Sequence, residues 1–221
     1  MGRLKQLRFD ELNILGAYEA PRSMPIEQWF GEMNLSESEK KTRISFATAL
    51  MALVFTALTR IYVFRSYGYE DLSSIDKDLT EQFLVLIDDY TVLDNPIRRY
   101  VRRYVRRLID TTIAHLGDGA PSADSYWLSE DRARLNAENE TNSIFNYDEF
   151  RIAKANGYKY KTWVTMGDER VRPTHVEVEG LTIPIDEYFH VGNSLLAYPR
   201  DLSTDPDPDD VVNCRCTLTY S

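Results

Sequence analysis

The hydrophobic pattern changes its period once, near Asn156-Gly157, and this change constrains the fold more than any other feature. Before it, apolar residues recur every three to four positions, which is typical of amphipathic helices. After it, the stretch YKTWVTM alternates between polar and apolar residues, which is typical of a β-strand. Helices that precede a small antiparallel sheet make an α+β protein. We therefore expect an N-terminal all-helical domain, then a small mixed domain with a helix and a short antiparallel sheet.

The first part of the chain is expected to hold three helices and a linker. The helices are expected over 36–66, over 76–92, and from Pro96 to near His115. The stretch LGDGAPSADS follows, and its Gly, Pro, Ser and Asp residues are typical of a linker. We therefore place the domain boundary at about residue 120, with a helical docking domain over 1–120 and a second domain over 121–221.

Residues 44–64 are apolar enough to raise the question of a membrane. They contain one charge, Arg60, and their length suits a bilayer span of ~20 residues. However, the stretch follows Ser36 and Glu39, whose spacing predicts a capping box at a helix start. Several threonines also dilute its hydrophobicity. We favour a helix buried in a bundle or an oligomer, and a membrane-attached protein is the weaker alternative.

The stretch PIRRYVRRYVRRLI repeats pairs of arginines along the third expected helix. On a helical wheel all six fall on one half of the circumference: Arg98, Arg99, Arg102, Arg103, Arg106 and Arg107. Six guanidinium groups on one face repel each other unless an anionic group lies opposite. One alternative is a solvated face, partly paired with acids such as Asp88, Asp89 and Asp94. The other is contact with a partner protein or with DNA, although the net charge of −9 argues against a chain that binds nucleic acid with its whole surface.

The end of the chain combines an acidic loop with the only two cysteines. The loop DLSTDPDPDD contains Pro206 and Pro208, and we expect it to stay open because it is too acidic to pack. The final stretch, VVNCRCTLTY, alternates and is expected to form a closing strand. Cys214 and Cys216 lie two positions apart in this stretch, and their thiolates could bind one metal ion if the strand kinks.

Four separated motifs in this part occur in an order that resembles the phage Mu F-like head morphogenesis family, the minor head proteins of tailed phages. They are K-x-W-x-T-x-x-D-E-R-V-R-x-x-H, G-x-x-x-P-I-D-E-x-F, Y-P-x-D and N-C-R-C-T, and they follow a helix with a Glu- and Asn-rich surface. The resemblance covers roughly residues 130–218. The matching residues are Lys161, Trp163, Thr165, Asp168, Glu169, Arg170, Val171, Arg172, His175, Gly180, Pro184, Ile185, Asp186, Phe189, Tyr198, Pro199, Asp201, Asn213, Cys214, Arg215, Cys216 and Thr217.

The resemblance implies a structural protein of the virion rather than an enzyme. Such a protein would lie inside the procapsid and the phage head beside the portal, and in the host cytoplasm during assembly. It would assist head assembly and the packaging or ejection of the genome, as part of a multi-copy assembly. Its implied partners are the portal protein, other head proteins and the packaged DNA, and the arginine helix would bind the portal or the DNA.

The chemistry of the motif residues leaves a metal centre and a polar lock as alternatives. His175, Cys214 and Cys216 offer three zinc ligands, and Asp168, His190 or water would supply the fourth. In the alternative, the cysteines belong to the core and polar side chains lock a turn against the final strand. The lock would consist of Trp163, Asp168, Arg170, Arg172 and Asn213.

A rival function uses part of the same set. A histidine next to two arginines and an acid resembles an RNase-like site that acts on nucleic acid. His175 would be the general base, with Asp168 beside it, and Arg170 and Arg172 would stabilise negative charge. No phosphate-binding loop or other catalytic motif accompanies this set.

Overall fold

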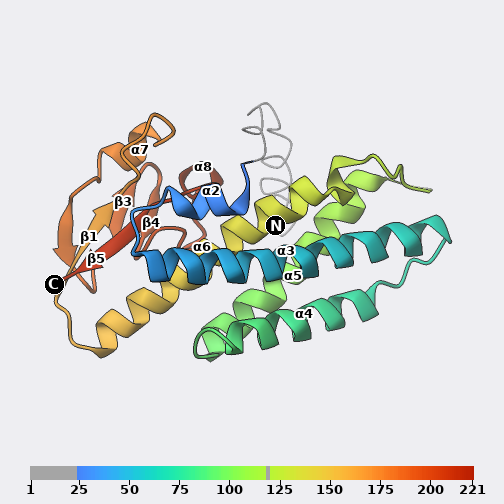
Figure 1. Ribbon diagram of the computed structural model, residues 1–221, viewed down its shortest axis with the longest axis horizontal. Coiled ribbons are helices and arrows are strands. Elements are labelled where there is room, and N and C mark those ends of the chain that lie inside the picture. The colour runs from blue at the N-terminus through green and yellow to red at the C-terminus, as the bar shows by residue number, and fades with distance from the viewer. Residues whose placement is uncertain (1–23, 118–119) are drawn as a thin grey trace, which may run out of the picture. The chain divides into compact units, whose positions relative to one another are not determined.

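A computed structural model describes residues 24–117 and 120–221 of the protein (Figure 1). Its elements, in chain order, are α2 (Ile26–Gly31), α3 (Glu37–Ser66), α4 (Ser73–Asp88), α5 (Asn95–Leu116), the 3-10 helix η1 (Tyr126–Leu128), α6 (Glu130–Ala155), β1 (Tyr160–Val164), α7 (Pro173–Val176), β2 (Thr182–Pro184), β3 (Phe189–Val191), β4 (Ser194–Leu196), α8 (Pro208–Val211) and β5 (Thr217–Tyr220). Helices precede a small antiparallel sheet, so the expected α+β class is confirmed. Residues 1–23 of the expected helical domain lie outside the described residues.

The chain forms two compact units. One contains residues 44–138, and the other joins the described residues up to Arg43 to Asn139–Ser221. Helices α3 and α6 therefore contribute residues to both units. The domain boundary expected at about residue 120 separates parts that would fold independently, and it stays a prediction.

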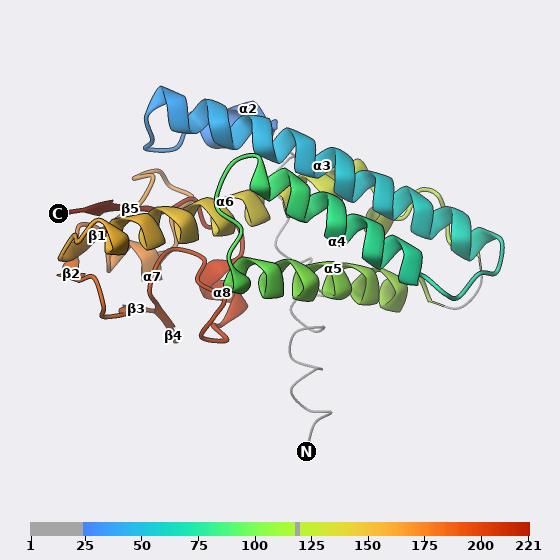
Figure 2. The ribbon, with the colours of Figure 1, turned by 90° about the horizontal axis from the view of Figure 1, so that it is seen from below.

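In the unit over 44–138, helices α4 and α5 lie side by side (Figure 2). Asp94 caps α5, because its Oδ1 accepts a hydrogen bond from the backbone N–H of Ile97 at 2.8 Å, and a proline occupies the first turn. The apolar half of α5 is buried, including Val101 and Val105. The division of this helix into an arginine half and an apolar half is therefore what the structure shows.

Helix α3 is the one helix of the described residues that is long and apolar enough to cross a membrane. Its buried side chains recur every three or four residues and include Phe46, Leu50, Val54, Leu58 and Ile61, all with no exposed surface. Phe46 contacts other aromatic side chains of the same unit, edge-on in one case. These contacts favour the interpretation of a helix buried in a bundle.

The ends of the first two long helices show how local hydrogen bonds set helix bounds. The capping box at α3 is confirmed: the N–H of Ser36 donates to Glu39 Oε2 at 2.8 Å, and the N–H of Glu39 donates to Ser36 Oγ at 3.3 Å. Helix α4 begins three residues before the expected start and ends four before the expected end. Asp71 accepts from the N–H of Ser73 at 2.9 Å, and this turn starts the helix earlier than apolar spacing indicates.

In the other unit, β1 lies between β2 and β5 and is antiparallel to both. Strands β3 and β4 form a separate hairpin. Trp163 of β1 lies opposite Leu218 of β5, and both belong to an apolar core with Phe189, Leu196 and the two cysteines. Strand β1 thus buries every second side chain, Lys161 and Trp163, as the alternating stretch predicts.

A buried lysine joins the sheet to the hairpin. Lys161 has no exposed surface, and its Nζ donates to the carbonyls of Glu187 and Ala197 at 2.6 and 2.7 Å. Burial, and then the charge of Lys154, lowers the pKa of Lys161 to about 8. The positive charge is stabilised by main-chain oxygens rather than by a carboxylate ion pair.

Two expectations about the end of the chain are wrong. The closing strand covers only Thr217–Tyr220, because Pro208–Val211 form α8 and Asn213 turns the chain with a φ of +56°. The acidic loop also packs: Asp201 and Asp210 are buried. Asp210 accepts from the N–H of Asn193 at 3.0 Å and from Ser194 Oγ at 2.7 Å, so hydrogen bonds replace the water that its carboxylate loses.

Candidate functional site

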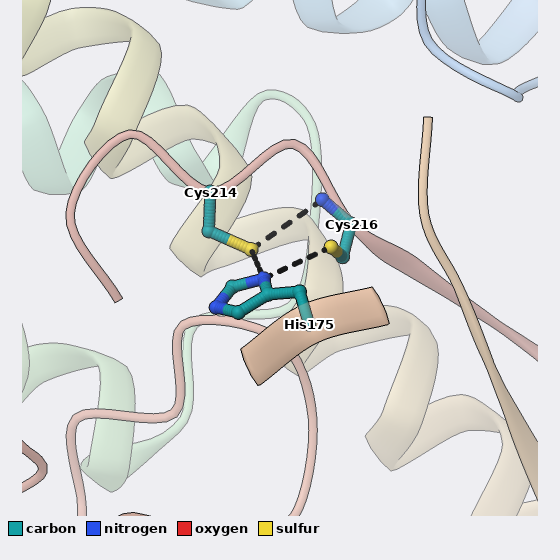
Figure 3. A group of neighbouring side chains, drawn as sticks. All are labelled: His175, Cys214 and Cys216. Carbon is teal, nitrogen blue, oxygen red and sulfur yellow. Dashed lines mark hydrogen bonds between the residues drawn. The ribbon is translucent and has the colours of Figure 1, made fainter. Parts of the chain in front are cut away.

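His175 lies in the short helix α7 and points into the protein, where 2% of its surface is exposed. Its Nε2 lies 2.9 Å from the backbone carbonyl oxygen of Asp210. Because a carbonyl only accepts, Nε2 carries the proton and donates it. The other ring nitrogen, Nδ1, faces two thiols, at 3.3 Å from Cys216 Sγ and 3.6 Å from Cys214 Sγ (Figure 3).

The two cysteines lie in the turn before β5, and both side chains point toward the histidine ring (Figure 3). The left-handed residue Asn213 turns the chain, and the N–H of Cys216 then donates to Cys214 Sγ at 3.4 Å. Both thiols are free and 3% exposed.

The three side chains perturb one another electrostatically. Burial alone would raise the pKa of the Cys214 thiol, but hydrogen bonds from Cys216 and His175 and the charge of His175 bring it well below its usual value. The hydrogen bond with Cys214 and burial raise the pKa of the Cys216 thiol. Burial opposes protonation of His175, yet the nearby Cys214 thiol raises its pKa overall. The pKa shifts of the two thiols therefore have opposite signs, and negative charge is favoured on Cys214 over Cys216.

A row of asparagines on α6 holds this turn in place. Asn142 Nδ2 donates to the carbonyl of Cys214 at 2.8 Å, and Asn146 Nδ2 donates to the carbonyl of Cys216 at 3.2 Å. Asn139 accepts from the N–H of Asn213 at 2.8 Å. We expected a polar surface here, but these side chains are buried. Their spacing of three and four residues puts them on one face of a helix. This spacing is the feature of the sequence that could have indicated a shared, buried face.

Two buried arginines complete the polar core behind the asparagines. Arg43 of α3 is 1% exposed and donates to Asn142, to Asn146 and, at 2.6 Å, to the Glu149 carboxylate. Arg200 is 4% exposed and donates to Asn139 Oδ1 at 2.5 Å and to Ser143 Oγ at 2.9 Å. The turn that contains Cys214 and Cys216, which we call the cysteine turn, is thus fixed by a hydrogen-bond network of charged and amide groups.

The residues expected to form a polar lock occupy three different places. Trp163 lies in the apolar core, with its ring edge-on to His175 at 5.8 Å between centroids. Asp168 accepts from Arg215 at 2.5 Å and from Arg170 at 3.0 Å, and Arg170 also binds Glu32 at 2.5 Å. Arg215 also donates to Glu32 at 3.3 Å, so two arginines and two carboxylates form a closed ring of alternating charges.

Two further members of that set engage the turn before β5 directly. Arg172 donates to the carbonyl of Val212. Asn213 is the left-handed residue whose backbone N–H binds Asn139. Together with Arg215, which lies between the two cysteines, they connect the cysteine turn to its surroundings on both sides.

The described residues contain one group of histidine, cysteine or acidic side chains whose ligand atoms converge as for a metal ion, and it is His175 with Cys214 and Cys216. Neither Asp168 nor His190 joins it. The carboxylate of Asp168 is occupied by two arginines, and His190 is exposed on β3. Of the three fourth ligands that the sequence suggested, water is the one compatible with these positions.

The residues of the expected RNase-like set are separated in the same way. His175 is buried with both ring nitrogens engaged, while Asp168 and Arg170 pair with each other at an exposed position. Among the described residues, no hydrogen bond joins His175 to Asp168, Arg170 or Arg172. The enzyme hypothesis stays a prediction that a nuclease assay would test.

The arginine half of α5 is a second candidate site, and we call it the arginine face. Its members are Arg98, Arg99, Arg102, Arg103, Arg106 and Arg107, and all six are exposed. Five of them, all except Arg107, take part in none of the ion pairs of the described residues, so Asp88 and Asp89 do not neutralise them. Arg102 and Arg106 line a hollow together with Asp76 and Glu81 of α4.

Comparison of the sequence with models of known protein families identifies a family for this chain. The family model described as Phage Mu protein F like protein matches residues 101–219, more than half of the chain. The match runs from α5 through the cysteine turn to β5. It defines the class of the protein, which is that of phage head morphogenesis proteins. The chain belongs to the phage Mu protein F-like family. Neither the curated proteins nor the solved structures that were compared contain a match.

Proposed function

We propose that this protein is a minor head protein that binds the portal through the arginine face and so takes part in head assembly and in genome packaging or ejection. Membership of the family supports the coarser part of this statement, a role in the phage head. The observation that carries the finer part is a row of exposed arginines, five of which have no ion-pair partner within the described residues. Like charges kept this close call for an anionic surface opposite them.

The surroundings of the arginine face favour a protein partner over DNA. Asp76 and Glu81 share a hollow with Arg102 and Arg106, so positive and negative groups alternate across the two helices. Phosphates of a DNA backbone would be repelled by these carboxylates, whereas a protein surface can present both signs in register. The net charge of −9 also disfavours DNA as the main partner. We therefore infer that the binding surface is a patch on the portal with both signs of charge, whose acidic groups lie opposite the arginines.

The exposed stripe of α3 is a second surface for assembly. Phe55 and Val63 are 38% and 42% exposed on the side of this apolar helix that is not buried. In a multi-copy assembly within the head, this stripe would contact helices of neighbouring subunits. The arginine face would then determine which partner is bound. The apolar stripe would add contacts whose strength does not depend on the salt concentration.

Co-purification with the portal protein tests this function. In the double variant Arg102→Glu/Arg103→Glu the arginine face changes by four charges, and we expect portal affinity to fall about tenfold or more, with wild-type affinity decreasing as salt rises. Lys41→Glu/Lys159→Glu changes the same number of charges at two exposed lysines and serves as the matched control. Unchanged portal binding by the arginine variant would contradict the proposal. So would a variant that loses only DNA binding.

A further inference from the structure

The distances among His175, Cys214 and Cys216 match those between ligands of one tetrahedral ion. Zinc binds nitrogen at ~2.0–2.1 Å and sulfur at ~2.3 Å, so two such ligands at a tetrahedral angle lie roughly 3.5 Å apart. Nδ1 of His175 lies 3.3 and 3.6 Å from the two sulfurs, and all three ligand atoms lie within 4.8 Å of one another. The nitrogen-to-sulfur separations are therefore already those that a bound ion requires.

The surroundings of the ligands are those of a metal centre as well. A histidine that binds a metal usually donates its other N–H to a carbonyl or carboxylate, which fixes the ring and the tautomer. His175 does so through Nε2 to the carbonyl of Asp210, and the carboxylate of Asp210 is itself held by Asn193 and Ser194. The protonated Nε2 leaves Nδ1 with its lone pair facing the thiols.

The cysteine turn is arranged for sulfur that carries negative charge. The N–H of Cys216 points to Cys214 Sγ at 3.4 Å, which is the kind of contact that stabilises a thiolate. The indole N–H of Trp163 is buried and has no acceptor at hydrogen-bond distance among the described residues. It lies beside the Cys216 thiol in the apolar core. A thiolate at Cys216 would give this orphaned donor a partner.

We propose that His175, Cys214 and Cys216 bind one zinc ion, with a water molecule as the fourth ligand, and that this ion fastens α7 to the turn before β5. Thiolate and imidazole ligands select zinc over magnesium or calcium, which prefer oxygen. The ligands are separated by 39 and 41 residues in the sequence, so the ion closes a long loop that contains β2, β3, β4 and α8. All three protein ligands are buried, and the role proposed for the ion is to hold α7 to this turn.

Elemental analysis and cobalt substitution of the purified full chain test this site, with no portal or other partner present. We expect about one zinc per chain in protein prepared without chelator. Cobalt added to the reduced, metal-free protein should give one equivalent of thiolate-to-cobalt absorption in the near ultraviolet. A chelator should lower the thermal midpoint of the wild type.

Matched variants locate the ion. Cys214→Ser and His175→Ala should each abolish the cobalt absorption, whereas His190→Ala, which changes an exposed histidine on β3, should keep it. The cobalt titration of the wild-type protein tests the site without any variant. The test therefore remains valid even if a variant fails to fold. Absence of zinc together with absence of the cobalt band in folded wild-type protein would overturn the proposal, and so would a full band in Cys214→Ser.

Discussion

Asn139 and Asn213 hydrogen-bond to each other twice, although 74 residues separate them. Nδ2 of Asn139 donates to Oδ1 of Asn213 at 2.9 Å, and Oδ1 of Asn139 accepts from the backbone N–H of Asn213 at 2.8 Å. Asn213 has a left-handed φ of +56°, a conformation that asparagine tolerates better than most residues. The pair therefore fixes the point at which the chain turns toward Cys214, and a helix that was expected to be a polar surface supports the turn from inside.

Removing Asn139 should destabilise this turn. Asn139→Ala leaves the N–H of Asn213 without its acceptor and removes one of the acceptors of the Arg200 guanidinium. We expect the free energy of unfolding to fall by about 2–4 kcal/mol. Urea denaturation followed by circular dichroism measures this change. Asn156→Ala, just past the end of the same helix at an exposed position, is the control and should change stability by less than about 1 kcal/mol. Equal effects in the two variants would contradict the account.

A methyl group at Gly192 should displace the carboxylate of Asp210. A Cβ at this position would lie 2.2 Å from Asp210 Oδ1, and its φ of +56° strains any other residue. We expect Gly192→Ala to cost about 2 kcal/mol or more, and Gly157→Ala, where φ is +82° but no atom lies within 4 Å, to cost about 1 kcal/mol. Thermal unfolding of both variants checks the difference. A Gly192→Ala protein as stable as Gly157→Ala would show that Asp210 is not held where the structure places it.

The charge state of Glu138 should make stability depend on pH. Burial raises the pKa of Glu138 from 4.5 to about 7, opposed by Arg134, whose Nε lies 3.9 Å away. Because the folded pKa exceeds the ordinary value, this group contributes its full stability below about pH 4.5 and loses it as the pH rises through 7.

Glu138→Gln removes that dependence. At pH 8 the variant should be more stable than the wild type by about 2–3 kcal/mol, and at pH 4.5 the two should be nearly equal. Glu130→Gln, at an exposed position on the same helix, should show no such crossover. Urea unfolding at the two pH values measures both. A gain for Glu138→Gln that is the same at pH 4.5 and pH 8 would exclude burial of its charge as the cause.

Arg215 should anchor α2 to the cysteine turn. Its guanidinium donates to Asp168 at 2.5 Å and to Glu32 at 3.3 Å, and it lies over the ring of Trp29 at 5.6 Å from the centroid. Trp29 is buried in the wild-type protein. Arg215→Ala removes these contacts, and we expect chymotrypsin to cleave the variant after Trp29 several times faster than it cleaves the wild type. Lys159→Ala, at an exposed position, is the control. Mass spectrometry of the fragments measures the cleavage rate. Cleavage of Arg215→Ala at the wild-type rate would contradict the role of Arg215 as an anchor.

The parts of the fold that were predicted from the sequence are those with a local signal. Ser36 and Glu39 cap their helix through each other, and the apolar residues of α5 alternate with its arginines at helical spacing. Trp163 alternates with polar neighbours, so β1 was expected. The order of the motifs identified the family, and the family match confirms it.

The parts that were missed depend on partners far away in the chain. Asn142 and Asn146 look like surface residues until Arg43 and the carbonyls of Cys214 and Cys216 satisfy their amides. In the same way, an acidic loop packs only because Asn193 and Ser194 donate to Asp210. Polar burial of this kind has no period, since it depends on where a donor lies in space rather than on spacing along the sequence.

The most direct test of the central claim is the amount of this protein in purified phage heads. Quantitative immunoblotting of DNA-filled heads should detect it in the wild-type phage and show a loss of most of it in a phage that carries Arg102→Glu/Arg103→Glu. A phage with Lys41→Glu/Lys159→Glu should retain the wild-type amount. Absence of the protein from wild-type heads, or equal amounts in all three phages, would contradict a minor head protein held in place by its arginine face.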